Sequence, residues 1–411
     1  MDFPLFYRIQ QDFDATAIAD IEGCVRQQFE QADFGSGVKK GQKVAVAVGS
    51  RGINNLPTLV RAVVKSLKAL DLKPFIIPAM GSHGRATAEG QAQILEDMHV
   101  SEDSVGAPII SSMEVVSLGY VENGAEVFCA RDAFEADHVV AINRVKPHTA
   151  FRGEVESGLC KILAVGLGKQ KGASLTHKFG LGRVIVPAAQ RILEKINVLC
   201  GIAVVENPLD QIHTIQLALP ESFVATDRRL LKLAWQMFPR IPLDDLDILI
   251  VDEMGKNISG AGIDPNIVGA WRREGGTRTP DYRTLIVLDL TDESHGNAVG
   301  IGLADLTTQY VMQKVDLKAT YMNAITAGIL RSSLMPIPLE NDRVVLETAL
   351  NLLVDPQRVR MVRIVNTLMV QNLWVTEPCL PELREKENLI VDDQPFSVEF
   401  DDQNRLKPFK A

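Results

Sequence analysis

The chain of 411 residues is 46% hydrophobic and 23% charged, and at roughly 150 residues per domain it is expected to form two or three domains. Its 43 basic and 52 acidic side chains give a net charge of −9 at pH 7, without a run of five or more basic residues. Affinity for a phosphate backbone depends on clustered Lys and Arg, which argues against a nucleic-acid partner. No apolar stretch approaches the ~20 residues of a membrane helix, so no membrane partner is expected either.

The N-terminus has neither the basic region nor the apolar region of a secretory signal, and we therefore expect a cytoplasmic protein. The five cysteines are odd in number and widely spaced, which disfavours both a disulfide framework and a thiolate zinc site. They are expected to be mostly small buried residues.

Strand and helix patterns alternate along the first half of the chain. Residues 43–48 form a β-branched run that suits a strand covered on both faces, and a helix with apolar residues at helical spacing is predicted over 56–70. The next pair is a strand at 74–77 and a helix at 87–98. Further strands are predicted at 114–118, 125–130, 138–143, 162–165 and 202–205. This alternation indicates a mainly parallel, doubly wound sheet.

The pattern restarts in the second half. A helix is predicted at 228–237, and after a Pro-rich turn the apolar run 246–251 is expected to be the first strand of a new α/β domain. The predicted domains are therefore 1–240 and 241–411. A strand at 285–290 and helices at 304–315 and 344–353 complete the second domain. The predicted fold class is α/β, with two mainly parallel doubly wound sheets and an active-site cleft between the domains.

Three histidines follow predicted strands or lie in nearby glycine-rich loops: His83 in Gly-Ser-His-Gly, His148 in Lys-Pro-His-Thr, and His177. Ligands of open α/β sheets bind beyond the carboxyl ends of the strands. A single loop histidine is usually a surface residue. Two at successive strand ends favour acid/base chemistry, because imidazole exchanges protons near pH 7.

Between these histidines, the segment Arg-Gly-Glu-Val-Glu-Ser-Gly-Leu-Cys-Lys ends at Lys161. Ser157 and Gly158 can offer backbone N–H groups to a phosphate, and Lys161 can supply a cation or a nucleophilic amine. The alternative is a tight turn with a solvated lysine. Arg51, after the first strand, is either a clamp for a substrate carboxylate or a surface residue in a turn.

Taken together, the Gly-Ser-His-Gly loop with Glu89, the Lys-Pro-His148 sequence, Lys161 and His177 resemble the nickel-dependent lactate racemase family of nickel-pincer-nucleotide-dependent 2-hydroxy acid isomerases. The likeness covers about residues 40–270. Lys161 and His177 are 16 residues apart, the separation expected between the family's cofactor-bearing lysine and its nickel-binding histidine.

The resemblance implies a racemase or epimerase that inverts C2 of a 2-hydroxy acid by hydride transfer to and from a cofactor. That cofactor is the nickel-pincer nucleotide, pyridinium-3,5-bisthiocarboxylic acid mononucleotide, tethered to Lys161, with Ni²⁺ bound by His177. Ser157 and Gly158 would lie in the cofactor-binding loop. The implied partners are a small 2-hydroxy acid substrate and the enzymes that make the cofactor.

The resemblance also implies an acid/base pair, His83 and His148, and a carboxylate-binding Arg51. Two departures stand out: the segment from His148 to Lys161 is longer than expected, and Gly-Ser replaces the acidic residue expected just before Arg51. In the second domain, polar residues of a glycine-rich loop are expected to contact substrate. These are Lys256, Asn257, Asp264, Asn266 and Arg272.

Three other functions fit a fold of this class. A nicotinamide-dependent 2-hydroxy acid dehydrogenase is disfavoured because no G-x-G-x-x-G follows the first strand. A non-catalytic module that binds a nucleotide or a carboxylate would not need two titratable histidines. A zinc hydrolase could use three histidines, but the presence of Lys161 and the lack of H-E-x-x-H or of carboxylate ligands at metal spacing disfavour it.

An acidic protein that binds anions needs a local positive field. We expect this field from a basic pocket of six residues. They are Arg51, Lys146, Arg152, Lys161, Lys169 and Lys171.

Overall fold

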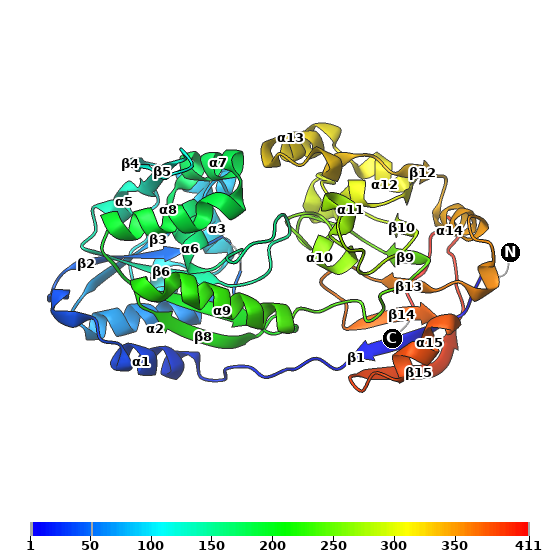
Figure 1. Cartoon of the computed structure of the whole chain (residues 1–411), viewed down its shortest axis with the longest axis horizontal. Helices are drawn as coiled ribbons and strands as arrows, with labels where there is room; N and C mark the ends of the chain where they lie inside the picture. Colours follow the sequence, from blue (N-terminus) through cyan, green and yellow to red (C-terminus); the bar gives the residue numbers. More distant parts are fainter. Residues whose placement is uncertain (1–2, 51, 410–411) are drawn as a thin grey trace. The chain divides into compact units, whose positions relative to one another are not determined.

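The computed structural model describes residues 3–50 and 52–409, which divide into two compact units (Figure 1). The N-terminal unit is Asp14–Phe238, and the C-terminal unit combines the residues up to Phe13 with those from Pro239 onward. The predicted boundary at residue 240 lies next to this division. The structure differs from the predicted domain 1–240 at the start of the chain. There, strand β1 (Phe6–Gln11) pairs with two strands of the C-terminal unit rather than with its neighbours in sequence.

Five strands form the central sheet of the N-terminal unit, in the order β3-β2-β6-β7-β8. The first four are parallel and β8 is an antiparallel edge strand. Their bounds are β2 (Lys43–Val48), β3 (Lys73–Pro78), β6 (His138–Arg144), β7 (Val198–Glu206) and β8 (Ile212–Ala218). The strands predicted from the sequence at 43–48, 74–77, 138–143 and 202–205 are thereby confirmed.

Helices cover both faces of this sheet. Successive residues of a strand point to opposite faces, so Ala45 and Ala47 of β2 belong to one buried cluster, and Val44 and Val46 to the other. Helices α1 to α4 contribute to the valine side, and α5, α6, α8 and α9 to the alanine side. The helices are α1 (Ile21–Gln31), α2 (Leu56–Ala69), α3 (Ala88–Asp97), α4 (Glu102–Val105), α5 (Arg131–Phe134), α6 (Leu159–Lys161), α7 (Lys169–Phe179), α8 (Leu181–Lys195) and α9 (Phe223–Gln236).

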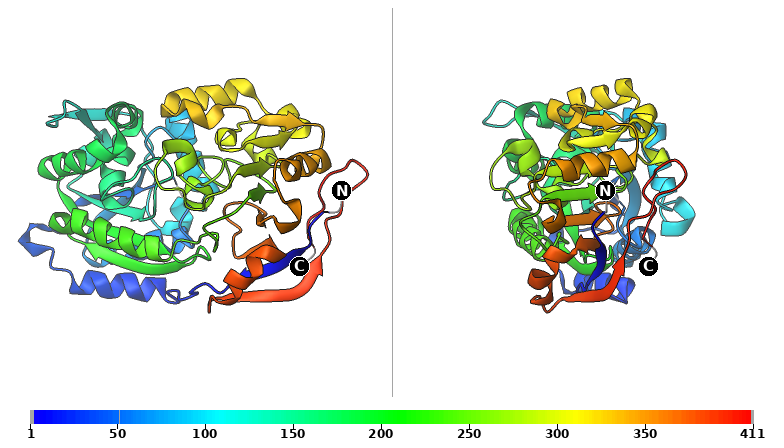
Figure 2. Two further views of the ribbon diagram at one scale, coloured as in Figure 1. Left: turned by 45° about the vertical axis from the view of Figure 1, so that its right-hand side comes forward. Right: turned by 90° about the vertical axis from the view of Figure 1, so that its right-hand side faces the viewer.

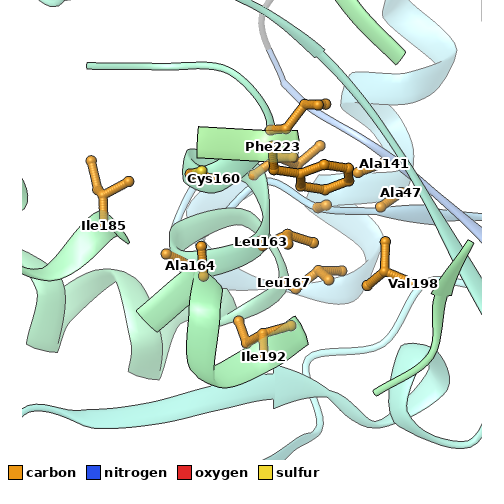
Figure 3. Packing of buried hydrophobic residues seen from close by; sticks show 14 of the residues in the cluster. Ala47, Ala141, Cys160, Leu163, Ala164, Leu167, Ile185, Ile192, Val198 and Phe223 are labelled. Atoms are coloured by element: carbon orange, nitrogen blue, oxygen red, sulfur yellow. The ribbon is translucent and has the colours of Figure 1, made fainter. Parts of the chain in front are cut away.

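The strand predicted at 162–165 is wrong. Residues Ile162–Leu167 form a turn of π-helix that continues α6 and leads into α7. The periodicity of an apolar run of four residues does not distinguish a buried strand from a buried helix. Here the run is part of a helical segment that is buried on several sides. In Figure 3, Leu163, Ala164 and Leu167 of this helix lie among Phe223 and other side chains of the cluster.

The strands predicted at 114–118 and 125–130 exist, but they do not join the parallel sheet. They are β4 (Val115–Tyr120) and β5 (Glu126–Ala130), and they form a separate antiparallel pair. The short connection between them suits a hairpin, which needs no crossover helix.

The C-terminal unit is built on an eight-stranded sheet, in the order β12-β11-β10-β9-β13-β14-β1-β15. The first five strands are parallel and the last three antiparallel, and both views of Figure 2 show β1 (blue) beside β15 (red). The strands other than β1 are β9 (Ile248–Val251), β10 (Thr284–Val287), β11 (Leu306–Thr308), β12 (Ile337–Leu339), β13 (Met361–Ile364), β14 (Asn372–Thr376) and β15 (Leu389–Phe396).

Six helices of the C-terminal unit accompany this sheet among the residues described. They are α10 (Pro265–Val268), α11 (Trp271–Glu274), α12 (Gln309–Lys314), α13 (Leu317–Ala327), α14 (Asp342–Asn351) and α15 (Leu380–Arg384). The helix predicted at 304–315 is shorter than expected, because its first part is strand β11. Within the described ranges, no helix combines the length and apolar character needed to cross a bilayer.

Candidate functional site

The loop after β3 carries His83. The N–H of Gly81 donates to the carbonyl of Gly166 at 3.2 Å, which ties this loop to the π-helix. The exposed imidazole of His83 meets a residue from the neighbouring strand end, because its Nδ1 is hydrogen-bonded to the hydroxyl of Ser50. The carboxyl ends of β2 and β3 therefore bring Ser50 and His83 together, as expected for adjacent parallel strands.

The segment after β6 carries His148. Its Nδ1 accepts a hydrogen bond from the N–H of Ala150 at 2.9 Å, so a neutral ring carries its proton on Nε2. The ring of Phe151 packs against the imidazole with 4.6 Å between ring centroids, and Arg152 donates to the carbonyl of His148 at 2.7 Å. These local contacts fix the orientation of the imidazole.

Glu156 links this segment to Lys161. Its carboxylate is 2% exposed and accepts hydrogen bonds from the N–H groups of His148 (2.8 Å) and Gly153 (3.2 Å). Burial raises the pKa of Glu156, while the two backbone hydrogen bonds and the positive charges of Arg152 and Lys161 oppose that rise. Glu156 thus binds the backbone of His148 and also feels the positive charge of Lys161. The local sequence carries no indication of this role.

Lys161 ends the short helix α6, whose N-terminus is capped by a distant buried carboxylate. The N–H groups of Leu159 and Cys160 donate to the two oxygens of Asp227 at 2.9 and 2.8 Å. Asp227 is fully buried on α9, and burial raises its pKa to about 6. An acidic cap stabilises a helix start, so Asp227 fixes the turn that carries Lys161.

The packing around this cap explains Gly158. Its φ of +85° is a conformation that side chains rarely adopt, and a Cβ on this residue would lie 2.1 Å from Oδ1 of Asp227. The requirement for glycine here is steric. Its carbonyl accepts from the side chain of Asn143 at 2.7 Å, which ties the loop to the end of β6.

His177 lies in the last turn of α7, near Lys161. Partial burial, and then the positive charge of Lys161, lower the pKa of the His177 imidazole. The ring is therefore neutral at pH 7, which is the form that binds a metal ion. The consecutive helices α6, the π-helix and α7 bring Lys161 close enough to His177 for its charge to act on the imidazole.

Ser157 is buried and hydrogen-bonded to the backbone of Lys146. Its hydroxyl accepts from the N–H of Lys146 at 2.7 Å and donates to the carbonyl of the same residue at 2.6 Å. These bonds close the loop between β6 and α6. The predicted cofactor contacts of Ser157 and Gly158 stay predictions, and Arg51 lies outside the described residues.

Of the six residues expected to form a basic pocket, Lys169 does not present its charge to a ligand, and the pocket itself stays a prediction. Lys169 is 1% exposed, and its ammonium is hydrogen-bonded inside the N-terminal unit rather than presented to a ligand. Lys171 is exposed, with its ammonium 5.9 Å from the ring centroid of Phe128. Among the described residues, no group of three or more His, Cys, Asp or Glu side chains is placed to hold a metal ion.

In the C-terminal unit, the predicted substrate residues Lys256 and Asn257 lie in one polar cluster. The ammonium of Lys256 donates to the carbonyl of Gly260 (2.5 Å) and to the side chain of Asn323 (3.0 Å). Asn257 accepts from the hydroxyl of Thr291 at 2.7 Å. Both side chains thus have partners inside this unit, and their contact with substrate stays a prediction.

The remaining predicted residues of this unit also take part in local hydrogen bonds, and their contact with substrate stays a prediction. Asp264 caps α10 by accepting from the N–H of Asn266 at 2.9 Å. Arg272 is paired in a bidentate manner with Asp305 at 2.7 and 2.6 Å, and its guanidinium lies 4.8 Å from the ring centroid of Tyr282. Arg272 would have to leave Asp305 before it could bind a substrate carboxylate.

These features define a two-unit α/β protein whose first unit places His83 and His148 after the carboxyl ends of two parallel strands, and whose Lys161 acts on His177 through its charge. Residues 9–179 match the family described as lactate racemase N-terminal domain. A solved structure of the lactate racemase apoprotein from Thermoanaerobacterium thermosaccharolyticum resembles the chain with a TM-score of 0.54 and 14% sequence identity, over 87% of this chain and 94% of that one.

No curated protein matches the chain by sequence. At 14% identity the solved structure establishes likeness of fold. Together, the domain match and this fold confirm the resemblance to the lactate racemase family that the sequence indicated.

Proposed function

We propose that the protein is an isomerase that inverts C2 of a 2-hydroxy acid, with a nickel-pincer nucleotide tethered to Lys161. The observation that carries this proposal is the proximity of Lys161 and His177, within a stretch that matches a lactate racemase N-terminal domain. One residue is the expected point of attachment and the other the expected nickel ligand. His83 and His148 supply the two proton-exchanging groups that such a reaction needs.

The residues fit the cofactor by their chemistry. A neutral imidazole is a suitable ligand for nickel(II), and the lowered pKa of His177 favours the neutral form. Lys161 offers a primary amine on a turn that is held rigid by the Asp227 cap. When bound, the cofactor would supply reversible hydride chemistry at C2 of the substrate.

The protein's part in the reaction is proton exchange at the 2-hydroxyl. One imidazole of the pair His83 and His148 accepts the hydroxyl proton as the 2-keto acid forms. After the keto acid has turned, the other imidazole donates a proton to the carbonyl oxygen as the opposite hydroxyl is made. Two histidines are needed because the two enantiomers present their hydroxyls from different sides.

Their neighbours prepare the two rings for this task. The Ser50 hydroxyl contacts Nδ1 of His83, and the Ala150 N–H donates to Nδ1 of His148. With Nδ1 occupied, Nε2 of each ring is the atom assigned to exchange the proton. We assign the substrate carboxylate to Arg51, and the contacts from the C-terminal unit to Lys256, Asn257, Asp264 and Asn266.

The experiment is a racemisation assay in heavy water. The protein is produced together with the enzymes that make the cofactor, and single enantiomers of a panel of 2-hydroxy acids are incubated with it. The proposal predicts conversion to the other enantiomer with hydrogen kept at C2, because hydride held on a cofactor does not exchange with solvent. Complete deuteration at C2 would indicate proton abstraction instead, and conversion to a 2-keto acid that requires added nicotinamide cofactor would indicate a dehydrogenase.

A further inference from the structure

Lys169 is a buried cation that the proposed reaction does not use. Its side chain is 1% exposed, and its ammonium donates to the carbonyl of Pro78 at 2.5 Å and to Oε1 of Gln91 at 3.0 Å. Burying an ammonium is unfavourable unless it is hydrogen-bonded, and an apolar side chain would fill the same space more simply. A lysine at this position therefore has a use that filling space does not explain.

The backbone of Lys169 is also unfavourable. Its φ of +51° lies in the left-handed region, which non-glycine residues visit at the expense of roughly 1 kcal/mol or more. Burial lowers the pKa of its ammonium to about 8, and the negative charge of Asp132 opposes that effect. Both features occur at the first residue of α7, eight positions before His177 on the same helix.

Gln91 extends the contact from Lys169 to the loop of His83. This side chain is fully buried on α3, and its amide nitrogen donates to the carbonyls of Gly81 (2.9 Å) and His83 (3.3 Å). Its oxygen accepts from Lys169. A glutamine has both an acceptor and donors, and here each is used in a different direction. The series Lys169, Gln91, His83 thus joins the start of α7 to the backbone of the proposed acid/base residue.

We propose that Lys169 and Gln91 form a positioning pair that holds the His83 loop in register with the helix carrying His177. The catalytic meaning of this pair rests on the proposed function, whereas its structural meaning does not. Pro78, the end of β3, is held by the same ammonium, so the pair fixes the loop both where it leaves the strand and at the histidine. The link is made of buried hydrogen bonds, which are lost sharply when one partner is removed.

The test is hydrogen–deuterium exchange of the apoprotein, followed by mass spectrometry of the peptide that spans residues 79–86. Gln91→Met removes the link to the loop, and Gln91→Glu keeps an acceptor for Lys169 but removes both donors. We expect about tenfold faster exchange of this peptide in both variants. Lys169→Met should give the same local change. The matched control is Gln93→Met, because Gln93 is on the same helix but exposed and bonded to Asp97.

In protein that carries the cofactor, Gln91→Glu should reduce kcat about tenfold while KM, nickel content and the mass of the Lys161 peptide stay unchanged. Unchanged exchange in both Gln91 variants would overturn the proposal, as would faster exchange spread evenly over the strands of the unit. If Lys169→Met does not fold, the Gln91 variants still decide. If the wild type has no racemase activity, the proposed function fails, and the exchange measurement still tests the pair.

Discussion

The ammonium of Lys161 lies close enough to the imidazole of His177 for its charge to lower the pKa of that imidazole. The two residues are on successive helices, and the π-helix Ile162–Leu167 between them sets how far each is rotated. π-Helical turns interrupt the regular 3.6-residue period and are frequent at functional sites. This relationship joins the proposed attachment point of a cofactor to the proposed ligand of its metal.

Removing the positive charge of Lys161 should raise the pKa of the His177 imidazole. In Lys161→Ala one of the two causes that lower it is gone, while burial still acts in the same direction. The protonated imidazole becomes easier to form, so its titration midpoint moves to higher pH. NMR titration of the histidine ring protons in the apoprotein measures this shift. Lys195→Ala, at the exposed end of α8, is the control and should leave it unchanged.

The buried cap Asp227 should make stability depend on pH. Burial raises its pKa from 3.8 to about 6, so the folded protein binds a proton more tightly than the unfolded chain does. The stabilisation from this group is complete below pH 3.8 and is lost as the pH rises through 6. Two pKa units correspond to about 3 kcal/mol.

The substitution Asp227→Asn removes this titration. Urea unfolding of both proteins between pH 4.5 and 7.5 should show that the wild type loses stability relative to the variant as the pH rises, by about 2 kcal/mol. All other titrating groups are the same in the wild type and the variant, so their contributions to the difference in stability cancel. A stability difference that stays constant over this range would contradict the assignment.

Gly158→Ala should be strongly destabilising for a steric reason. The new Cβ would lie 2.1 Å from Asp227 Oδ1 and 2.9 Å from a methyl of Val145, in addition to the strain of a positive φ. We expect a loss of about 3–5 kcal/mol in the free energy of unfolding. Gly180→Ala is the matched control, because Gly180 also has a positive φ but a Cβ on it would meet no atom of the described residues within 4 Å. It should cost about 1–2 kcal/mol. Equal losses in the two variants would show that the contact with Asp227 is unimportant.

Substitution of either proposed acid/base residue should reduce turnover without affecting cofactor binding. In His83→Gln or His148→Gln, turnover should fall by a factor of about 10² to 10⁴, because general acid/base catalysis is lost. Nickel content and the mass of the Lys161 peptide should not change. Steady-state kinetics with each enantiomer, together with metal analysis, make this comparison. Wild-type rates in either variant would remove that residue from the mechanism.

Much of the N-terminal unit could be predicted from the sequence because its signals are local. The buried strand at 43–48 and the amphipathic helix that follows it are set by residues within one turn or one strand of each other. The predicted strand ends also put His83 and His148 in the loops that follow them, and the structure has both residues there.

What could not be predicted depends on contacts between distant residues. Asp227 caps a helix that begins 68 positions earlier, and Lys169 reaches a carbonyl 91 positions away. Strand β1, near the start of the chain, pairs with β14, near its end, and no local sequence pattern indicates this pairing. The role of Glu156 also appears only in the fold, where this charged residue is buried between Val155 and Ser157. A carboxylate in such a setting needs partners, and here they are the backbone of His148 and the charge of Lys161.

Attachment of the cofactor to Lys161 and binding of its nickel by His177 can be tested together. The most direct measurement is peptide mass spectrometry combined with metal analysis, on protein produced together with the cofactor-making enzymes. We expect a mass increase confined to the peptide that contains Lys161 and about one nickel per chain, with the modification absent in Lys161→Ala and nickel reduced in His177→Ala. An unmodified Lys161 peptide in protein that contains no nickel would contradict it.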